Sequence, residues 1–366
     1  MTERLDYATA GVDVHAGERA VQLMRASIAS AQRAETRGDF GGFVGLFDAS
    51  ALAGYRQPLL ATSTDGVGTK IVIAQMMDKH DTIGIDLVAM IVDDIVVCGA
   101  EPLFLTDYIA CGKVTPERIA AIVSGIATGC QMAGAALLGG ETAEHPGVMH
   151  ADEYDLAAAG TGVVEADQLR SAERVQPGDV LVAMRSSGLH SNGFSLVRAA
   201  LLDAAGMKLD VHVDDLGRTL GEELLEPTRI YTKDCLALCE KLGDDLRVFS
   251  HITGGGIAAN IARVVPEHLH ADVQRSTWQP QPVFDLIAHS GNVGAADMEQ
   301  TFNLGLGMVA VVAASAADAC VAELNSRGVD AWACGTVRAR EVDDASDAPA
   351  KGGRGGSVRL LGAHSG

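Results

Sequence analysis

The chain has 366 residues, of which 48 % are hydrophobic and 21 % are charged, a composition that excludes a disordered chain and suits two packed domains. Its formal net charge of -20 argues against binding to nucleic acid or to anionic membranes, because both need clustered lysine and arginine. The 42 glycines indicate many tight turns, and we expect some of them to approach a ligand closely.

Seven cysteines are scattered along the sequence without zinc-ligand spacing, so we expect reduced thiols in a cytoplasmic protein. The first residues are charged and contain no apolar signal segment. The uncharged stretch 119–140 includes Gly125 and Gly129 in a GxxxG pattern, but its five glycines and its polar residues keep its hydropathy low. We interpret it as a buried helix to about Ala133 followed by a short strand, and not as a membrane span.

The first half of the chain alternates apolar runs with glycine- and proline-containing turns. A helix start is marked by Thr115 as N-cap and Pro116 at the first helical position. Strands and helices alternate without the clear parallel βαβ pattern of a nucleotide-binding fold. The expected elements are helices at 17–35, at 82–98 and from 116, a glycine-rich turn at 38–48, and strands at 58–64, 103–110, 135–138 and 154–164.

The polar segment 164–179, with its Pro-Gly turn, is the best candidate for a domain boundary. We therefore expect an N-terminal domain at 1–170 and a C-terminal domain at 175–340. The second domain is expected to open on a strand at 179–188 and to end on a strand near 332–337. The remaining residues, 341–366, are interpreted as a low-complexity mobile loop and a short edge strand at 358–362.

The string STDGVGTK follows a predicted strand and combines an acid, two glycines, a hydroxyl and an ammonium. Exposed amides and a lysine suit a polyphosphate, and an acid at a strand end suits a metal ion. The spacing differs from that of a Walker A loop, and a glycine-rich turn is by itself more often structural. The candidate binding residues are Asp65, Gly66, Gly68, Thr69 and Lys70.

Three carboxylates, Asp86, Asp93 and Asp94, lie in the apolar helix predicted at 82–98. Burial of an unpaired carboxylate is costly, so we expect at least one of them to meet a cation; an exposed acidic stripe is the alternative. Glu141 follows the Gly139-Gly140 pair after a predicted strand, where it is a further oxygen donor for magnesium or an ordinary turn acid.

In the second domain, His190 lies with Ser191 and Asn192 in a glycine-containing loop before an amphipathic helix. Taken alone, such a histidine is more often structural. A structural histidine should be buried, whereas one that transfers a proton should be partly exposed and contribute about 10²–10⁴ in rate. The string HITGGG at 251–256 precedes another helix, and a glycine run at a helix N-terminus is a potential anion site.

Together these strings are similar to those of the phosphoribosylformylglycinamidine cyclo-ligase family, also called aminoimidazole ribonucleotide synthetase, the fifth step of purine biosynthesis. The resemblance covers about residues 7–337, and several strings are eight or more residues long, so chance is negligible. In chain order the strings are AGVD, STDGVGTK, HDTIGIDLVAM, GAEPLF, GGETAE, SSGLHSNG, PTRIY, HITGGG and TFNLGLGM.

The resemblance implies an α/β (α+β) fold of two domains, in which the N-terminal domain binds ATP and dimerises through its sheet to build a shared barrel. It implies an enzyme, a ligase, that uses ATP and Mg²⁺ to phosphorylate the amide oxygen of formylglycinamidine ribonucleotide. A neighbouring nitrogen then closes the imidazole ring, and ADP and phosphate are released. The implied partners are these small molecules and a second copy of the chain, with no nucleic acid and no membrane.

The resemblance also implies residue roles. Asp65, Asp94 and Glu141 would hold magnesium, Lys70 would hold a phosphate oxygen, and His190 would shuttle a proton or steady the iminophosphate. ATP and phosphate would be bound by Asp65, Gly66, Gly68, Thr69, Lys70, Gly139 and Gly140. Substrate or phosphate would be bound by Ser191, Asn192, Thr253, Gly254, Gly255 and Gly256, and which phosphate the glycine run holds is left open.

Three features depart from the family pattern: Asp93 stands where many relatives carry Asn, His145 replaces a Met, and the loop at 341–356 is longer than usual. Sister families share the two-domain plan. Selenophosphate synthetase needs an early reactive cysteine, whereas the first here is Cys98. Thiamine-monophosphate kinase lacks the SSGLHSNG and HITGGG strings in this form, and formylglycinamidine synthetase is far longer or needs partner subunits. A non-catalytic protein would not need these strings together.

Overall fold

The computed structural model describes residues 13–38, 42 and 44–365. The chain divides into two compact units. The N-terminal unit contains the residues up to 95 and residues 102–165, and the C-terminal unit contains residues 96–101 and 166 onward. The predicted AGVD string and the turn at 38–48 lie partly outside the described residues.

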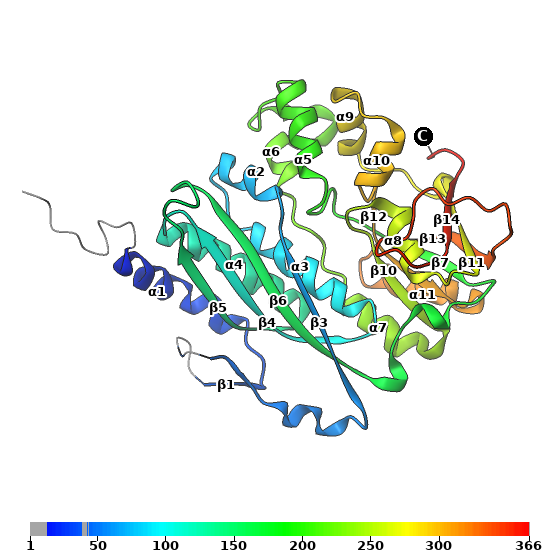
Figure 1. Ribbon diagram of the computed structural model, residues 1–366, viewed down its shortest axis with the longest axis horizontal. Helices are drawn as coiled ribbons and strands as arrows, with labels where there is room; N and C mark the ends of the chain where they lie inside the picture. The colour runs from blue at the N-terminus through cyan, green and yellow to red at the C-terminus, as the bar shows by residue number, and fades with distance from the viewer. Residues whose placement is uncertain (1–12, 39–41, 43, 366) are drawn as a thin grey trace, which may run out of the picture. The chain divides into compact units, whose positions relative to one another are not determined.

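The N-terminal unit is built on a four-stranded mixed sheet in the order β3-β6-β4-β5 (Figure 1). β3 and β6 are antiparallel, whereas β4 and β5 are parallel. A small pair, β1 (Thr36–Arg37) with β2 (Leu46–Phe47), and a 3-10 helix at Ala49–Gly54 precede the sheet. The main strands are β3 (Pro58–Gly66), β4 (Glu101–Cys111), β5 (Ala136–Glu144) and β6 (Tyr154–Glu165), and the helices are α1 (Val14–Ser30), α2 (Lys70–Met77), α3 (Ile83–Val96) and α4 (Pro116–Ala133).

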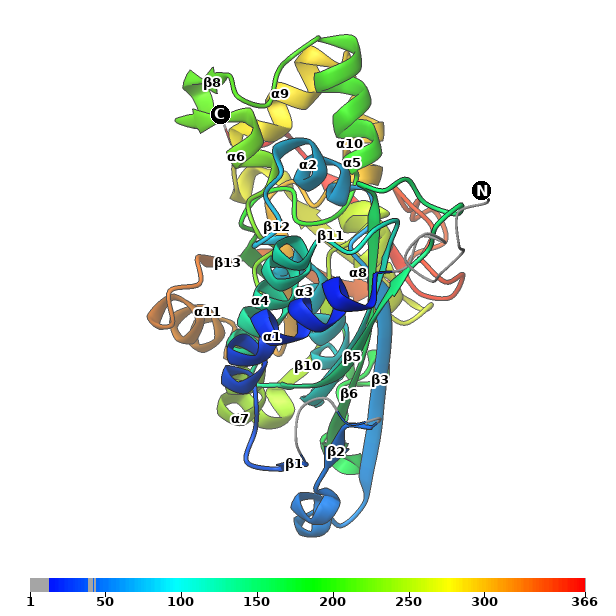
Figure 2. The ribbon, with the colours of Figure 1, turned by 90° about the vertical axis from the view of Figure 1, so that its left-hand side faces the viewer.

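Helices cover one face of this sheet and leave the other open (Figure 2). On the covered face, a Cβ added to Gly160 of β6 would meet Ile91 and Ile95 of α3. On the other face, alternate residues of β3 are exposed, and Leu60 keeps 64 % of its surface accessible. Tyr108 of β4 is 42 % exposed. Among the described residues the sheet is open and does not close into a barrel.

Helices α3 and α4 approach each other through glycine. A Cβ on Gly125 would lie 2.5 Å from the carbonyl oxygen of Asp81, and a Cβ on Gly129 would lie 2.8 Å from the Cβ of Val88. A Cβ on Gly84 would overlap the backbone of α4. The GxxxG pattern therefore packs two helices within one unit, and none of the described helices is long and apolar enough to cross a membrane.

The C-terminal unit contains a six-stranded sheet in the order β10-β12-β7-β13-β11-β14, antiparallel except for the β11–β14 pair. Its strands are β7 (Val180–Arg185), β10 (Leu246–His251), β11 (Leu269–Gln274), β12 (Leu306–Val312), β13 (Ala331–Ala339) and β14 (Ser357–Leu361), with a small pair β8 (His212–Val213) and β9 (Arg218–Thr219). Its helices are α5 (Phe194–Val197), which continues as a π-helix (Arg198–Ala204), α6 (Leu220–Leu224), α7 (Thr232–Leu242), α8 (Gly256–Val264), α9 (Pro282–Ser290), α10 (Ala295–Thr301) and α11 (Ala317–Ser326).

The core of the C-terminal unit forms where α7 and α11 pack on the sheet. Buried Leu238 of α7 and Leu324 of α11 join Phe249 of β10 and Met308 of β12 in one cluster. Val96 belongs to this cluster although it precedes β4 in the chain. Residues 96–101 are thus part of the C-terminal unit.

The structure confirms most of the elements predicted for the first half of the chain. The helix predicted from Pro116 to about Ala133 has these bounds and ends at Gly134 with φ +81°, a conformation that glycine adopts without strain. The helix predicted at 17–35 begins three residues earlier and ends at Ser30. In the second half, β7, β13 and β14 lie where strands are predicted, whereas β10, β11 and β12 were not predicted as strands.

We expect Gly125→Val to lower the free energy of unfolding by about 2–3 kcal/mol, because the added side chain would force α4 away from α3. Urea denaturation measures this change. The control is Gly54→Ala, which places a methyl group in open space and should change stability by less than about 0.5 kcal/mol. Equal stability of the two variants would contradict the close helix approach.

Candidate active site

The loop between β3 and α2 contains the first group of predicted ligand residues. Asp65 lies at the end of β3, and the backbone N–H of Gly66 donates to its Oδ1 at 2.7 Å. Gly68 has φ +73°, which favours glycine, and it is exposed together with Thr69. Thr69 is the residue before the first turn of α2. The backbone of this loop is therefore accessible to a ligand.

Lys70, in contrast, is completely buried. Its Nζ donates to Oδ1 of Asp86 on α3 at 2.9 Å, and neither side chain has any exposed surface. The prediction that at least one acid of α3 meets a cation is thus confirmed. Asp93 is also fully buried, so an exposed acidic stripe is the wrong interpretation of this helix. Direct contact of Lys70 with a phosphate stays a prediction, because its ammonium here ties α2 to α3.

The three predicted magnesium ligands come from three separate elements. Asp65 is on β3 and Glu141 is on β5, which are the two edge strands of the sheet. Three strand spacings of about 4.8 Å put these strands roughly 14 Å apart. Asp94 lies on α3, half-buried. Within the described ranges, no three His, Cys, Asp or Glu side chains converge as metal ligands. Mg²⁺ often binds one or two carboxylates together with phosphate oxygens, so the set stays a prediction.

A carboxylate that the sequence did not single out lies beside the predicted Gly139-Gly140 pair. Asp107 of β4 is paired with Gly140 of β5, and a Cβ on Gly140 would overlap the Asp107 carboxylate. Burial raises the pKa of Asp107 to about 7. The sequence did contain a signal for this buried acid, because Asp107 lies within the largely apolar strand sequence LFLTDYIA. Gly140 thus leaves room for a carboxyl group that titrates near neutral pH.

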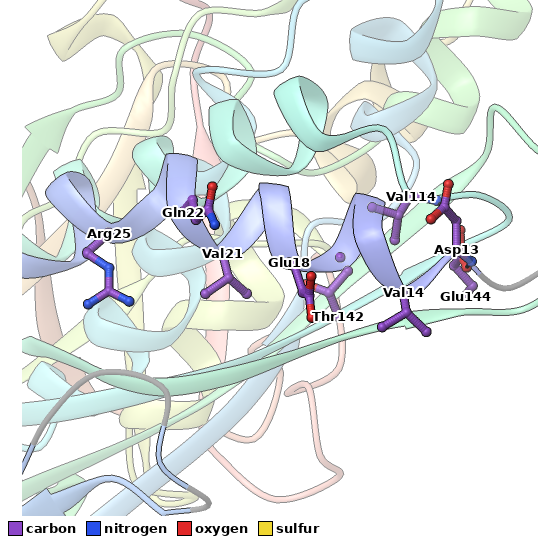
Figure 3. A pocket seen from close by; sticks show the side chains of 10 residues that line it. Asp13, Val14, Glu18, Val21, Gln22, Arg25, Val114, Thr142 and Glu144 are labelled. Carbon is purple, nitrogen blue, oxygen red and sulfur yellow. Dashed lines mark hydrogen bonds between the residues drawn. The ribbon is translucent and has the colours of Figure 1, made fainter.

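A cavity of about 540 Å³ lies between α1 and the end of β5 (Figure 3). Glu144, the last residue of the GGETAE string, accepts hydrogen bonds from the backbone N–H groups of Asp13 at 2.8 Å and Val114 at 2.7 Å. The GGETAE string therefore meets the end of the AGVD string, a contact that sequence analysis did not foresee. The lining residues are Asp13, Val14, Gly17, Glu18, Val21, Gln22, Arg25, Val114, Thr142 and Glu144.

In the C-terminal unit, the structure brings the SSGLHSNG and HITGGG strings together. The backbone N–H of Gly254 donates to Oδ1 of Asn192 at 2.9 Å. The hydroxyl of Ser191 lies 3.1 Å from that of Thr228, so the PTRIY string joins the same cluster. These predicted substrate-binding residues lie far apart in the sequence and form one loop cluster.

The glycine run adopts a backbone that other residues would strain. Gly255 has φ +99° and Gly256 has φ +71°. A Cβ on Gly256 would also overlap the carbonyl oxygen of Glu299. Asn260 supports the turn, because its Nδ2 donates to the carbonyl oxygens of Thr253 at 3.1 Å and Gly256 at 2.8 Å. Asn260 lies one turn into α8 and is buried. Nothing in the sequence singled it out.

His190 is 1 % exposed, with φ +61°. Its Nε2 accepts a hydrogen bond from the backbone N–H of Ser187 at 3.2 Å. Its ring lies 6.2 Å from the ring of Tyr231, and a Cβ on Gly307 would be 2.6 Å from Cε1. The sequence analysis took partial exposure as the mark of a proton-transferring histidine. The ring instead has the burial expected of a structural histidine.

Two family models match the chain: AIR synthase related protein, N-terminal domain, over residues 48–164, and AIR synthase related protein, C-terminal domain, over residues 176–347. The chain is 50 % identical over 331 residues to the phosphoribosylformylglycinamidine cyclo-ligase of Geobacillus kaustophilus, which covers 90 % of this chain and 95 % of that protein. The chain belongs to the phosphoribosylformylglycinamidine cyclo-ligase family. This membership confirms the resemblance drawn from the sequence strings.

Two solved structures that carry the names of other proteins share the fold. A thiamine-monophosphate kinase from Stenotrophomonas maltophilia has a TM-score of 0.63 and 17 % identity, covering 93 % of this chain and 95 % of that one. The hydrogenase maturation protein HypE in complex with ATP has a TM-score of 0.58 and 19 % identity, covering 90 % and 89 %. At these identities the likeness shows the two-domain fold alone, whereas the cyclo-ligase match identifies this chain as a member of a ligase family.

The raised pKa of Asp107 makes the stability of the folded chain depend on pH. Between pH 4 and 7 the unfolded chain ionises this group while the folded chain keeps its proton, so stability falls as pH rises and levels off above 7. Relative to wild type, Asp107→Asn should therefore gain about 2 kcal/mol between pH 5 and pH 8. Urea unfolding at the two pH values measures this gain.

The exposed turn residue Asp152 provides the control for this experiment. Asp152→Asn should track wild type at both pH values. A pH response of Asp107→Asn identical to that of wild type would show that Asp107 does not carry the effect.

Proposed function

We propose that the chain converts formylglycinamidine ribonucleotide and ATP into aminoimidazole ribonucleotide, ADP and phosphate. The observation that carries this proposal is the 50 % identity, over nearly the whole length of both chains, to a protein named phosphoribosylformylglycinamidine cyclo-ligase. The convergence of the SSGLHSNG and HITGGG strings at the Asn192–Gly254 hydrogen bond supports it, because these strings carry the family resemblance.

The proposed reaction has two steps. The γ-phosphoryl group of ATP moves to the amide oxygen of the substrate, which turns a poor leaving group into a good one. The neighbouring nitrogen then attacks the same carbon, the carbon–oxygen bond breaks, and phosphate departs with that oxygen. The protein has to orient the two reactants and to stabilise charge on the transferred phosphoryl group.

ATP binding is proposed for the N-terminal unit at Asp65, Gly66, Gly68, Thr69, Gly139 and Gly140. The similar fold of HypE, solved in complex with ATP, supports a nucleotide on this architecture. Mg²⁺ would be held by Asp65, Asp94 or Glu141 together with phosphate oxygens, and would neutralise phosphate charge. For Lys70, the buried pair with Asp86 favours a positioning role, in which it fixes the loop that precedes α2.

His190 is proposed to position the substrate loop. The acceptor at Nε2 holds the N–H of Ser187, and the ring fills the space beside Tyr231 and Gly307. Asn192, Gly254 and Gly255 are partly exposed and would then contact substrate or phosphate, whereas Gly256 is buried and shapes the turn. In this assignment the buried imidazole of His190 transfers no proton, and proton transfer is left to groups that contact the ligand.

The chain is proposed to form a homodimer in the cytoplasm, with the open face of the N-terminal sheet as the interface. That face exposes the large apolar side chains of Leu60 and Tyr108 together with the smaller Thr62 and Thr64, and exposed apolar side chains on a sheet face can mark an interaction surface. A second copy would cover it and would supply the other half of the barrel implied by the family resemblance. Sedimentation velocity at micromolar concentration measures this assembly, and a monomer would contradict it.

The proposed function is tested by ADP release from purified protein supplied with Mg-ATP and formylglycinamidine ribonucleotide. We expect ADP release that depends on the ribonucleotide, with one aminoimidazole ribonucleotide formed for each ADP. Removal of Mg²⁺ with EDTA should abolish turnover. Thiamine monophosphate is the control substrate, because a structural neighbour is named as its kinase; phosphorylation of thiamine monophosphate alone would refute the cyclo-ligase assignment.

We expect His190→Asn to keep its turnover rate within about tenfold of wild type, because Asn tolerates φ +61° and can offer an acceptor near the Ser187 N–H. His190→Ala should lower the melting temperature, because it leaves a cavity and strains the backbone. His268→Asn, at an exposed histidine of the same unit, is the control. If His190→Asn instead turned over more slowly by about 10²–10⁴ with unchanged melting, the proton-transfer role would be restored.

A further inference from the structure

Two of the seven cysteines are partly exposed, and they are neighbours in the fold. Cys98 follows α3, and Cys239 lies on α7, far later in the sequence. The five other cysteines are buried. Burial shields a thiol from oxidants and raises its pKa, to about 11 for Cys111 and to about 12 for Cys334. The two neighbouring thiols are therefore also the two that an oxidant in solution can reach.

Gly99 brings the two cysteines close to each other. It has φ +81°, and a Cβ added to it would lie 3.7 Å from Sγ of Cys239. Cys98 is the preceding residue, and consecutive Cα atoms lie about 3.8 Å apart. Burial raises the pKa of Cys239, and negative charge on Cys98 raises it further, so the two sulfur atoms interact. We expect a small movement of this glycine-containing turn to bring them within reach of a disulfide.

The turn is held on the C-terminal unit by backbone hydrogen bonds. The N–H of Arg170 donates to the carbonyl oxygen of Cys98 at 2.9 Å, and the N–H of Phe249 donates to that of Val97 at 3.3 Å. Residues 96–101 and α7 belong to the same unit. The proximity of the two thiols is thus a property of the C-terminal unit.

A buried guanidinium lies beside these thiols. Arg170 is 3 % exposed, and a Cβ on Gly99 would lie 2.9 Å from its Cγ. Its Nη1 donates to the carbonyl oxygen of Leu246 at 3.1 Å, whereas its buried Nε has no hydrogen-bond partner among the described residues. A buried cation with an unpaired N–H favours an anion beside it. Cys239 can become that anion, because Arg170 lowers its pKa against the larger effect of burial.

We propose that Cys98 and Cys239 form a redox-sensitive dithiol that a peroxide converts to a disulfide, and that Arg170 stabilises the Cys239 thiolate that begins the reaction. The thiolate attacks one oxygen of hydrogen peroxide, the O–O bond breaks, and the departing hydroxide takes up the thiol proton and leaves as water. The Cys98 thiol then attacks the sulfenic acid, the S–S bond forms, and the S–O bond breaks to release a second water. Two electrons pass from the two thiols to one peroxide.

The dithiol is separate from the residues proposed to bind ATP or substrate. A disulfide would join the segment 96–101, which links α3 to β4, covalently to α7. It would close a long loop between residues 98 and 239, so the oxidised chain should have a higher melting temperature than the reduced chain. Burial raises the pKa of both thiols, and oxidation should therefore become faster as pH rises from about 7 to 9, because the thiolate is the reactive form.

The test treats the reduced full chain with hydrogen peroxide, counts the remaining thiols in denaturant and maps disulfides by mass spectrometry. We expect two of the seven thiols to be lost, in one disulfide between Cys98 and Cys239 within a single chain, and to be recovered with dithiothreitol. Cys98→Ser and Cys239→Ser should form no disulfide within the chain. Retention of all seven thiols, a disulfide between other cysteines, or a cross-link only between two chains would overturn the dithiol.

The role of Arg170 is tested by the rate of the same reaction. Arg170→Gln keeps N–H donors without the charge and should form the disulfide about tenfold more slowly, whereas Arg170→Lys should retain most of the rate. Arg359→Gln, which removes a charge from an exposed position on β14, is the control and should react like wild type. A wild-type rate in Arg170→Gln, or equal slowing in Arg359→Gln, would remove Arg170 from the reaction.

Discussion

Close backbone approach at glycine is the constraint on which both units depend. With 4 % aromatic residues and 42 glycines, the chain fills its interior with small aliphatic side chains and brings main chains together. Gly125 lets α4 lie against α3, and Gly256 lets the start of α8 lie against Glu299. The same property that packs the helices therefore shapes the loop expected to hold phosphate, so packing and ligand binding share one physical cause.

Local sequence patterns were sufficient to predict many of the regular elements and the family. The bounds of α4 could be predicted because an N-cap, a first-turn proline and a terminal glycine all act within a few residues. The order of nine strings, some of eight or more residues, was sufficient to predict the family. Strand β12 was missed because its fully buried run LGMVAVV lacks the alternation that separates a strand from a buried helix. Strand β11, LHADVQ, does alternate apolar and polar residues, so its signal was present in the sequence and was overlooked.

Side-chain direction could not be predicted from these patterns. Burial cost predicted that an acid of α3 would meet a cation, but only the fold shows that the cation is Lys70, the same lysine assigned to phosphate. His190 belongs to a loop rich in glycine and serine, and yet its ring faces inward beside Tyr231. Lys351 lies in a low-complexity stretch, and the hydrogen bond from its ammonium to Thr253 depends on pairing of β14 with β11, a long-range event.

The assignment of residues 96–101 to the C-terminal unit has a consequence for how the chain can be divided. Val96 is part of the C-terminal core, and the carbonyl oxygens of Val97 and Cys98 accept hydrogen bonds from Phe249 and Arg170. A fragment that begins after β6 lacks these groups. A single recombination crossover therefore cannot transfer either unit as a whole. During synthesis, residues 96–101 of the C-terminal unit leave the ribosome before strands β4 to β6 of the N-terminal unit, so the C-terminal core is completed only after those strands have been made.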